Sequence, residues 1–312
     1  MELTFDRLHR AGYAGVWRPL LGVILAVGGS LVLLPALVVP VFVLLAALAG
    51  FSPGMTLDRV SDLSVMSPML LAFVNVALAS SILWIWAITR VLHGLKPRWV
   101  SSVGPRLRWR YLAACAVAAV ATMLVVVALS LLLPGADPNG AVGGSVNRFT
   151  EQSRSYLLII ALLTPLQAAG EEYVYRGYLT QAFGGAIGGN VGRWLAVIGP
   201  ALVFAFAHGS QDLPIFLDRF AFGLVAGVLV VRTGGLEAGI AMHVINNWVA
   251  LGLAVIFGDM ATVLTPTGGN WATIVVTLVQ SLLYLVLALG LARWMDVRHR
   301  VSGELVGPVR RV

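Results

Sequence analysis

The chain has 312 residues, of which 59% are hydrophobic and 11% are charged. Soluble globular proteins carry about 25% charged residues, so this composition excludes an ordinary soluble domain and indicates a polytopic membrane protein. The net charge of +7 comes from basic residues at the ends of apolar segments. Topology signals and contacts with anionic lipid explain that placement better than nucleic acid does. We therefore expect the lipid bilayer, and not nucleic acid, as a partner.

Eight apolar segments, counted against the requirement of about 20 residues for a membrane span, predict an all-α polytopic helix bundle. The first contains Pro35 and Pro40, which predicts a kink or a strong tilt. The fifth is short, which indicates an earlier start or a partly re-entrant element. The segments cover residues 20–48, 69–91, 110–133, 156–183, 194–208, 214–232, 236–257 and 271–292.

The sequence indicates a single membrane-embedded domain over residues 1–312. The first apolar segment is too long for the hydrophobic region of a cleavable signal peptide, so we expect it to stay as an anchor. Cys115 is the one cysteine of the sequence, which excludes an intrachain disulfide. Residues 134–155 are rich in Gly, Pro and Asn and are expected to form an extracytoplasmic loop.

Basic residues predict the orientation of the spans. They precede the first span, surround the second connection and follow the last span. Because cytoplasmic connections carry the excess of Lys and Arg, both termini are expected in the cytoplasm, and eight spans fit this arrangement. The residues are Arg7, Arg10, Arg18, Arg90, Lys96, Arg98, Arg106, Arg108, Arg110, Arg293, Arg298, Arg300, Arg310 and Arg311.

The fourth span carries Glu171, Glu172 and Arg176 in an otherwise apolar segment. Each such group at the bilayer centre costs roughly 2.5–3.5 kcal/mol on insertion scales, so the cluster is a functional hypothesis by default. Glu172 and Arg176 are four residues apart and share a helix face, with the acid first, which is the favourable order. Glu171 points about 100° away from Glu172. We expect it to face a polar cavity as a proton-accepting carboxylate.

Two further polar patterns follow on later spans: Phe204 with His208, and His243 with Asn247. The members of each pair are four residues apart, so His243 and Asn247 project from one helix face. A neutral imidazole can bind a metal or donate to an oxyanion, and an Asn amide can donate to one. With Glu171 as a base, these groups supply what water-mediated amide hydrolysis needs.

The order Glu-Glu-x-x-x-Arg, Phe-x-x-x-His and His-x-x-x-Asn on successive spans resembles the CAAX protease and bacteriocin-processing family of intramembrane endopeptidases, which includes the type II CAAX prenyl endopeptidases. The resemblance covers residues 155–257, which would form a catalytic four-helix core. It implies a general base that activates water, a water-holding histidine, two oxyanion donors and a supporting pair. On the matching positions, Glu171 would be the base and His208 would hold the water. His243 and Asn247 would be the oxyanion donors, and Glu172 and Arg176 the supporting pair.

The resemblance leaves the metal and the substrate open. Glu171, His208 and His243 could together supply three zinc ligands with an open fourth position, and a metal-free, glutamate-dependent mechanism needs the same residues. The substrate class is a peptide or membrane protein: prenylated proteins, exported peptides, bacteriocin self-immunity and membrane-protein turnover all fit. The composition, rich in Ala, Val, Arg and Gly, indicates a high-GC bacterial source.

Counting the helical rise tests whether these groups can meet. From Tyr156, Glu171 lies ~22 Å into its span, which leaves ~8 Å to the inner face of a ~30 Å core. His243 and Asn247 lie ~10 and ~16 Å from the inner end of theirs. These depths place all three residues in the inner half of the bilayer core. His208 does not agree, at ~21 Å from the inner end of the fifth span.

A transporter, or a non-catalytic membrane scaffold, would explain the same cluster without proteolysis. Its polar groups would be an ion or proton relay. A relay tolerates Asp in place of Glu171 and needs no oxyanion donor at Asn247, so these positions discriminate between the hypotheses.

Other polar and small residues are expected to have structural roles. Asp218 and Arg219, at the start of the sixth span, could line the cavity, but as adjacent residues they are expected instead to extend to the membrane interface. Gly223 and Gly227 form a Gly-x-x-x-Gly face that predicts helix packing. Finally, His93 and His299 accompany basic loop residues and are expected to belong to the topology signal.

Overall fold

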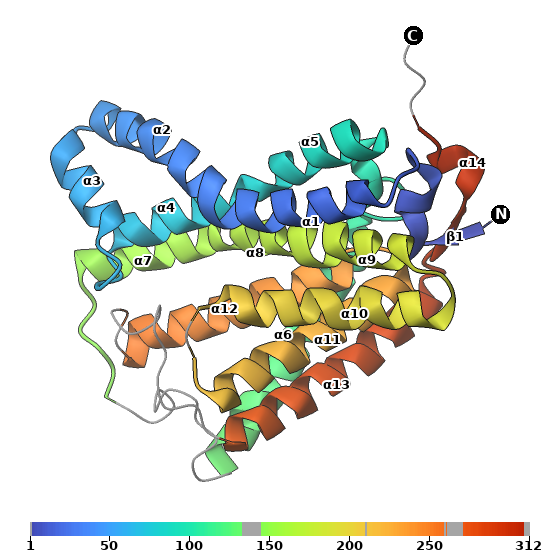
Figure 1. The fold of residues 1–312 in the computed structure, drawn as a ribbon. Coiled ribbons are helices and arrows are strands. Elements are labelled where there is room, and N and C mark those ends of the chain that lie inside the picture. The colour runs from blue at the N-terminus through green and yellow to red at the C-terminus, as the bar shows by residue number, and fades with distance from the viewer. Residues whose placement is uncertain (1, 133–144, 210, 259, 261–270, 309–312) are drawn as a thin grey trace.

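The computed structural model describes residues 2–132, 145–209, 211–258, 260 and 271–308, and these form a bundle of helices (Figure 1). Seven helices in this part of the chain are long and apolar enough to cross a membrane, and a bent helix pair raises the number to eight. The all-α polytopic bundle and the integral membrane location are therefore confirmed. Residues 134–144 of the predicted extracytoplasmic loop lie outside the described residues.

The helical elements follow the predicted spans closely, with short helices at the connections. In chain order they are η1 (Phe5–Ala11), α1 (Trp17–Gly28), η2 (Gly29–Leu33), α2 (Leu34–Leu48), α3 (Pro53–Ser61), α4 (Pro68–Ala79), α5 (Ser81–His93), η3 (Pro97–Val100), α6 (Trp109–Leu132), α7 (Glu151–Leu162), α8 (Thr164–Glu172), η4 (Tyr173–Leu179), α9 (Thr180–Ala186), α10 (Gly189–Ala207), α11 (Leu213–Thr233), α12 (Glu237–Phe257), α13 (Trp271–Trp294) and α14 (Gly303–Val306).

The first span is distorted at its prolines. The helix is continuous over Trp17–Leu48, but η2 is a π-helical turn directly before Pro35. Proline has no backbone N–H and its ring crowds the carbonyl four residues earlier. A π turn is a common way for a helix to absorb such a disturbance. The structure thus shows a π turn near the first proline, and the kink or tilt stays a prediction.

The fourth span is longer than predicted and bent. It runs from α7 through α8, η4 and α9, and its two parts meet at 40° around Leu163. Pro165 lies in the first turn of α8 and cannot donate to the carbonyl of Ala161, so the helix breaks just before it. From Thr164 to Ala186 the helical run continues without a break through Glu171.

The two ends of the chain lie on the same side of the bundle. β1 (Glu2–Thr4) pairs antiparallel with β2 (Arg300–Ser302), with Glu2 opposite Ser302, and Figure 1 shows them at one end of the molecule. An even number of crossings is what this arrangement requires. Which side is cytoplasmic stays a prediction from the basic residues.

The structure agrees with the packing role expected for Gly223, but the loop position expected for His93 is wrong. A Cβ on Gly223 would lie 2.9 Å from the Cβ of Ala201 on α10, so the Gly-x-x-x-Gly face does pack against a helix. His93 is not part of an exposed basic loop. It is buried, its Nε2 lies 2.8 Å from the Tyr178 hydroxyl, and its ring stacks on His9. Its place at the end of an apolar helix, which packs inward, accounts for this correction.

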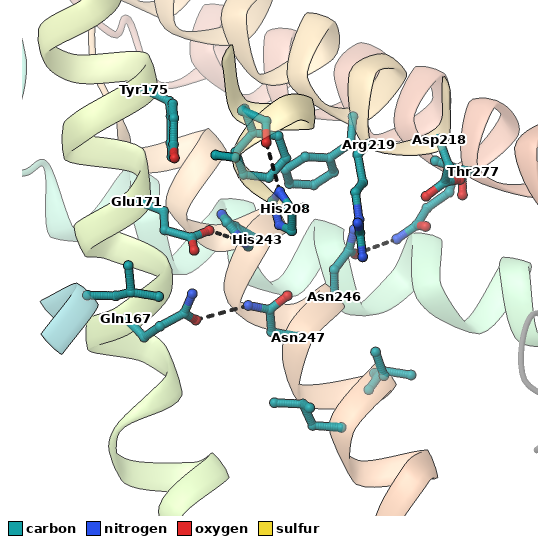
Figure 2. Close-up of a pocket in the computed structure, with 18 of the residues that line it drawn as sticks. Gln167, Glu171, Tyr175, His208, Asp218, Arg219, His243, Asn246, Asn247 and Thr277 are labelled. Atoms are coloured by element: carbon teal, nitrogen blue, oxygen red, sulfur yellow. Dashed lines mark hydrogen bonds and ion pairs between the residues drawn. The ribbon is translucent and has the colours of Figure 1, made fainter. Parts of the chain in front are cut away.

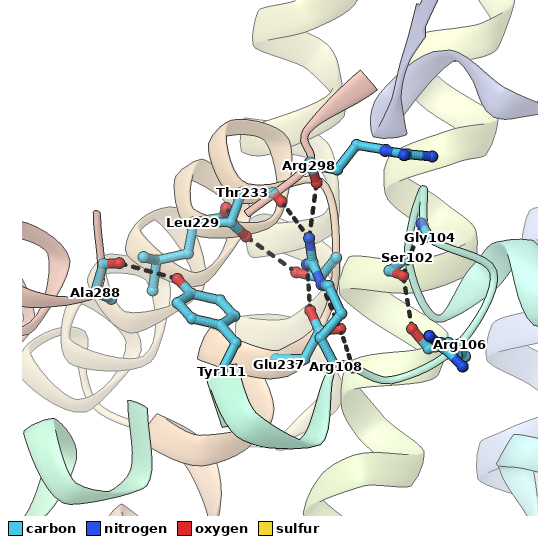
Figure 3. Close-up of polar contacts among 11 residues, drawn as sticks. Ser102, Gly104, Arg106, Arg108, Tyr111, Leu229, Thr233, Glu237, Ala288 and Arg298 are labelled. Atoms are coloured by element: carbon cyan, nitrogen blue, oxygen red, sulfur yellow. Dashed lines mark hydrogen bonds and ion pairs between the residues drawn. The ribbon is translucent and has the colours of Figure 1, made fainter. Parts of the chain in front are cut away.

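A buried ion pair fixes the start of α12. Arg108 donates through its backbone N–H and Nε to Oε1 of Glu237, at 2.9 and 2.8 Å, and through Nη2 to Oε2. Its Nη1 donates to the carbonyls of Thr233 and Arg298. Figure 3 shows this guanidinium at the centre of segments that are far apart in sequence. It joins the α11–α12 turn to the beginning of α6 and to the chain after α13.

We expect Arg108→Gln to destabilise the protein by roughly 3–5 kcal/mol, because it leaves Glu237 buried and unpaired. Thermal unfolding of the purified protein in detergent measures this. Arg154→Gln is the control, since its partner Glu151 and Arg154 itself are both largely exposed and such pairs contribute about 0–1 kcal/mol. Equal shifts for the two variants would contradict the role given to Arg108.

Candidate active site

The backbone of α8 lies against α4, and this contact positions the first glutamate. A Cβ on Gly170 would lie 2.1 Å from the carbonyl oxygen of Leu78, so only glycine allows the two helices to approach this closely. The next residue, Glu171, is partly exposed and lines a cavity. The π-helical turn η4 begins immediately afterwards, and such turns occur frequently at functional sites.

Glu172 and Arg176 form the predicted ion pair. Arg176 Nη1 donates to Glu172 Oε1 at 2.8 Å, and both side chains are almost completely buried. Arg176 Nε and Nη2 have no hydrogen-bond acceptor in the described part of the chain. The guanidinium instead lies 4.2 Å from the ring centroid of Phe204 and 5.4 Å from that of Phe222. Aromatic faces attract a cation, so these rings partly replace the missing acceptors.

His243 joins both glutamates, a contact that the sequence did not predict. Its Nδ1 lies 2.9 Å from Glu172 Oε1, and its Nε2 lies 3.4 Å from Glu171 Oε2. One turn earlier, a Cβ on Gly239 would lie 2.6 Å from Glu172 Oε2, so this glycine makes room for the carboxylate. A carboxylate accepts, so Nδ1 donates and carries the hydrogen. Neutral His243 then presents the Nε2 lone pair toward Glu171.

His208 follows the last residue of α10 and caps that helix. Its Nδ1 lies 2.7 Å from the carbonyl oxygen of Phe204. A carbonyl only accepts, so Nδ1 is the donor and the neutral ring keeps an acceptor at Nε2. The side chain lines the same cavity as Glu171.

The depth mismatch calculated for His208 shrinks to ~5 Å in the structure. α10 starts at Gly189, next to the end of α9. From that shared turn, Glu171 and His208 lie ~23 and ~28 Å away along their helices. The start of α12 also lies deep, since a Cβ on Gly177 of η4 would lie 3.6 Å from Leu236. The sequence count assumed straight spans that all begin at the membrane surface, and a bent helix and a deep turn break that assumption.

Asn247 is held by a residue that sequence reasoning missed. Asn247 Nδ2 donates to Gln167 Oε1 at 3.1 Å. Gln167 is nearly buried and lies four residues before Glu171, so one face of α8 carries both groups. That spacing is the signal that could have identified Gln167.

Glu171, His208, His243 and Asn247 all line one cavity of about 790 Å³. Figure 2 shows them entering it from α8, from the end of α10 and from α12. The predicted convergence of these four residues is therefore found. Their chemical roles are not tested by geometry alone.

Asp218 and Arg219 also line this cavity. The expectation that they extend to the membrane interface is wrong. Both belong to the second turn of α11, and this helix packs on α10 beside the cavity. Their side chains therefore reach the internal polar space rather than the bilayer surface.

The same cluster contains the three residues proposed as zinc ligands. Within the described residues, no three His, Cys, Asp or Glu side chains are arranged to hold a metal ion. His243 Nδ1 is bonded to Glu172 and His208 Nδ1 to a carbonyl, which leaves both Nε2 atoms available and matches the pattern of metal-binding histidines, whose other nitrogen donates to a carboxylate or carbonyl. The zinc set of Glu171, His208 and His243 does not form a three-ligand site in this arrangement and stays a prediction.

Fold and site together define an integral membrane helix bundle with carboxylate, imidazole and amide groups converging in one internal cavity. Residues 153–249 match the family described as "Type II CAAX prenyl endopeptidase Rce1-like". The family resemblance inferred from the three motifs is thus confirmed over the segment that carries them.

The chain is also similar to a curated protein of Bacillus subtilis (strain 168) named "Uncharacterized protein YyaK". The two are 26% identical over 194 residues, which is 60% of this chain and 63% of that protein. The name of this relative states no activity. No solved structure matches the chain.

Arg176→Ala is expected to reduce folded yield sharply, because it leaves Glu172 buried without its cation, a loss of roughly 3–5 kcal/mol. The measurement is the amount of monodisperse protein recovered in detergent, together with its unfolding temperature. Arg193→Ala, on an exposed side chain at the start of α10, is the matched control. Normal yield and stability of Arg176→Ala would show that the pair is dispensable for folding.

Proposed function

We propose that this protein is an intramembrane endopeptidase that hydrolyses peptide bonds of membrane-associated substrates with a water activated by Glu171. The observation that carries this proposal is the placement of a half-buried carboxylate, two imidazoles and an amide around one cavity. The match to a protease family over residues 153–249 supports it. Residues 155–257 would be the catalytic core, and the termini are proposed to face the cytoplasm.

The position of the reacting water follows from two facing acceptors. Glu171 Oε2 and His243 Nε2 are 3.4 Å apart, and both carry lone pairs when the imidazole is neutral. A hydrogen must lie between them. One water that donates a hydrogen to each, at about 2.8 Å, satisfies both. It would be held within reach of the base that takes its proton.

Hydrolysis then needs two proton transfers, one to Glu171 and one from it. As the water oxygen attacks the peptide carbonyl carbon, Glu171 takes a proton from the water. The carbon–nitrogen bond then breaks, and the same proton passes from Glu171 to the leaving nitrogen. Before the attack both hydrogens of this water are in use, so His208, whose neutral Nε2 only accepts, would hold it through a second water that donates to that Nε2 and to the oxygen of the first.

Asn247 would stabilise the charge that develops on the carbonyl oxygen. One hydrogen of its amide nitrogen is committed to Gln167 at 3.1 Å, and the second remains available. Because Gln167 fixes the amide, this donor is oriented before the substrate arrives, which is the requirement for oxyanion stabilisation. The oxyanion role that the resemblance implies for His243 would need a second proton at Nε2, and in the neutral form used here His243 instead holds the water as an acceptor.

The substrate would be a peptide or the flexible end of a membrane protein. A cavity of about 790 Å³ falls within the roughly 300–1,000 Å³ of small-ligand sites, which suits a short extended segment. Prenylated proteins, exported peptides, bacteriocin self-immunity and membrane-protein turnover are all compatible with that size. Zinc could assist, and no step is assigned to it.

Glu171→Gln should lower the cleavage rate by about 10²–10⁴-fold, because it keeps shape and hydrogen bonding and removes the base. The measurement is hydrolysis of internally quenched peptides by purified protein in detergent, with folded yield measured in parallel. Glu151→Gln is the control, since Glu151 is exposed on α7 of the same bent span.

The transporter hypothesis makes the opposite prediction. If Glu171→Gln cleaves at the wild-type rate but abolishes proton flux into proteoliposomes, the protease proposal fails. Retained cleavage in Glu171→Asp would also count against a precisely placed base.

A further inference from the structure

The cavity continues past the proposed reaction site to a cation on α11. Arg219 lines it together with Asn246 and Thr277, and Figure 2 shows its guanidinium pointing into the space beside Asn246. The mechanism above gives this arginine no role. An arginine in a membrane-embedded cavity is costly and marks a functional position by default.

The guanidinium is held in a fixed position. Arg219 Nη1 donates to Gln211 Oε1, and Gln211 Nε2 in turn donates to the carbonyl of Ala205 at 2.6 Å. The amide is thereby fixed to the last turns of α10, immediately before His208. A guanidinium held in this way is preorganised for a ligand.

The charge of Arg219 has no close counter-ion in the described part of the chain, where no carboxylate oxygen lies within 4.0 Å of it. Neighbouring Asp218 acts on this cation electrostatically, ahead of Glu171 and Asp212, but adjacent helical residues point about 100° apart, and none of the three carboxylates forms an ion pair with Arg219 in the described residues. Arginine has five N–H donors, and Gln211 takes one of them. Several charged donors are therefore left for a ligand.

We infer that Arg219 binds a carboxylate of the peptide substrate, and this rests on the proposed function. Arginine matches a carboxylate with two parallel hydrogen bonds. The guanidinium lines the same cavity as Glu171, so a group bound there lies in the space that holds the proposed reacting water. The carboxylate is either the C-terminus of the peptide or an Asp or Glu side chain. A lipid headgroup at this position would block the substrate.

The test compares cleavage of one reporter peptide in four forms: with a free C-terminal carboxylate or a C-terminal amide, each with Glu or Gln near the scissile bond. The wild-type protein should favour one carboxylate form, with a KM about 10–100-fold lower than that of its neutral counterpart. The pair that shows this difference identifies the source of the carboxylate. Arg219→Gln should abolish the difference and leave kcat nearly unchanged.

Binding is measured separately, so that it does not depend on turnover. In the Glu171→Gln background, acetyl-Ala-Leu-Val-Leu and a Glu-containing variant are titrated as free acid and as amide. Arg219→Lys should keep part of the preference because it keeps the charge, whereas Arg219→Gln should lose it. Arg232→Gln, exposed at the far end of the same helix, should bind like the parent.

The outcomes separate the two proposals. The inference about Arg219 is overturned if peptides are cleaved but no preference depends on Arg219. It is also overturned if the parent protein binds no carboxylate form better than its neutral counterpart. In both cases the protease proposal stands. If Arg219→Gln changes binding of phosphatidylglycerol vesicles and not of peptides, the ligand is a lipid headgroup and the inference is equally wrong. Cleavage that survives Glu171→Gln overturns the proposed function itself.

Discussion

The buried pair of Glu172 and Arg176 is the interaction on which the rest of the site depends. Neither charge is tolerable alone in an apolar bundle, and together they join four helices. The pair lies on α8 and η4, its guanidinium contacts rings of α10 and α11, and its carboxylate accepts from His243 on α12. That last contact fixes which nitrogen of His243 carries the hydrogen. The structural ion pair thereby orients the lone pair that faces Glu171.

Close backbone approaches make this arrangement possible. Gly170 lets α8 touch α4, and Gly239 leaves room for the Glu172 carboxylate beside α12. The break before Pro165 tilts α7 away from the rest of the span. At the other end, Arg108 and Glu237 hold the start of α12. The site is therefore supported from both sides by groups that take no part in the proposed chemistry.

Periodicity was sufficient to predict the spans and the pairing of Glu172 with Arg176, because both follow from hydropathy and from four-residue spacing within one helix. Contacts between helices depend on rotation and tilt, which spacing does not encode. The His243–Glu172 bond was therefore not predicted, and the depth of His208 was misjudged by counting straight helices. Arg219 was assigned to the interface because adjacent charges at a helix start usually reach water. Here a neighbouring cavity supplies the polar space instead.

The central claim is that Glu171 and His243 act on one water, and a double-mutant cycle tests it most directly. Cleavage rates are measured for Glu171→Gln, His243→Gln and the double variant, all at matched folded yield. Residues that act as a unit have strongly non-additive effects. The account predicts that the double variant is no slower than the slower single variant, within about threefold. Losses that multiply in the double variant would mean that the two residues act independently, which would contradict it.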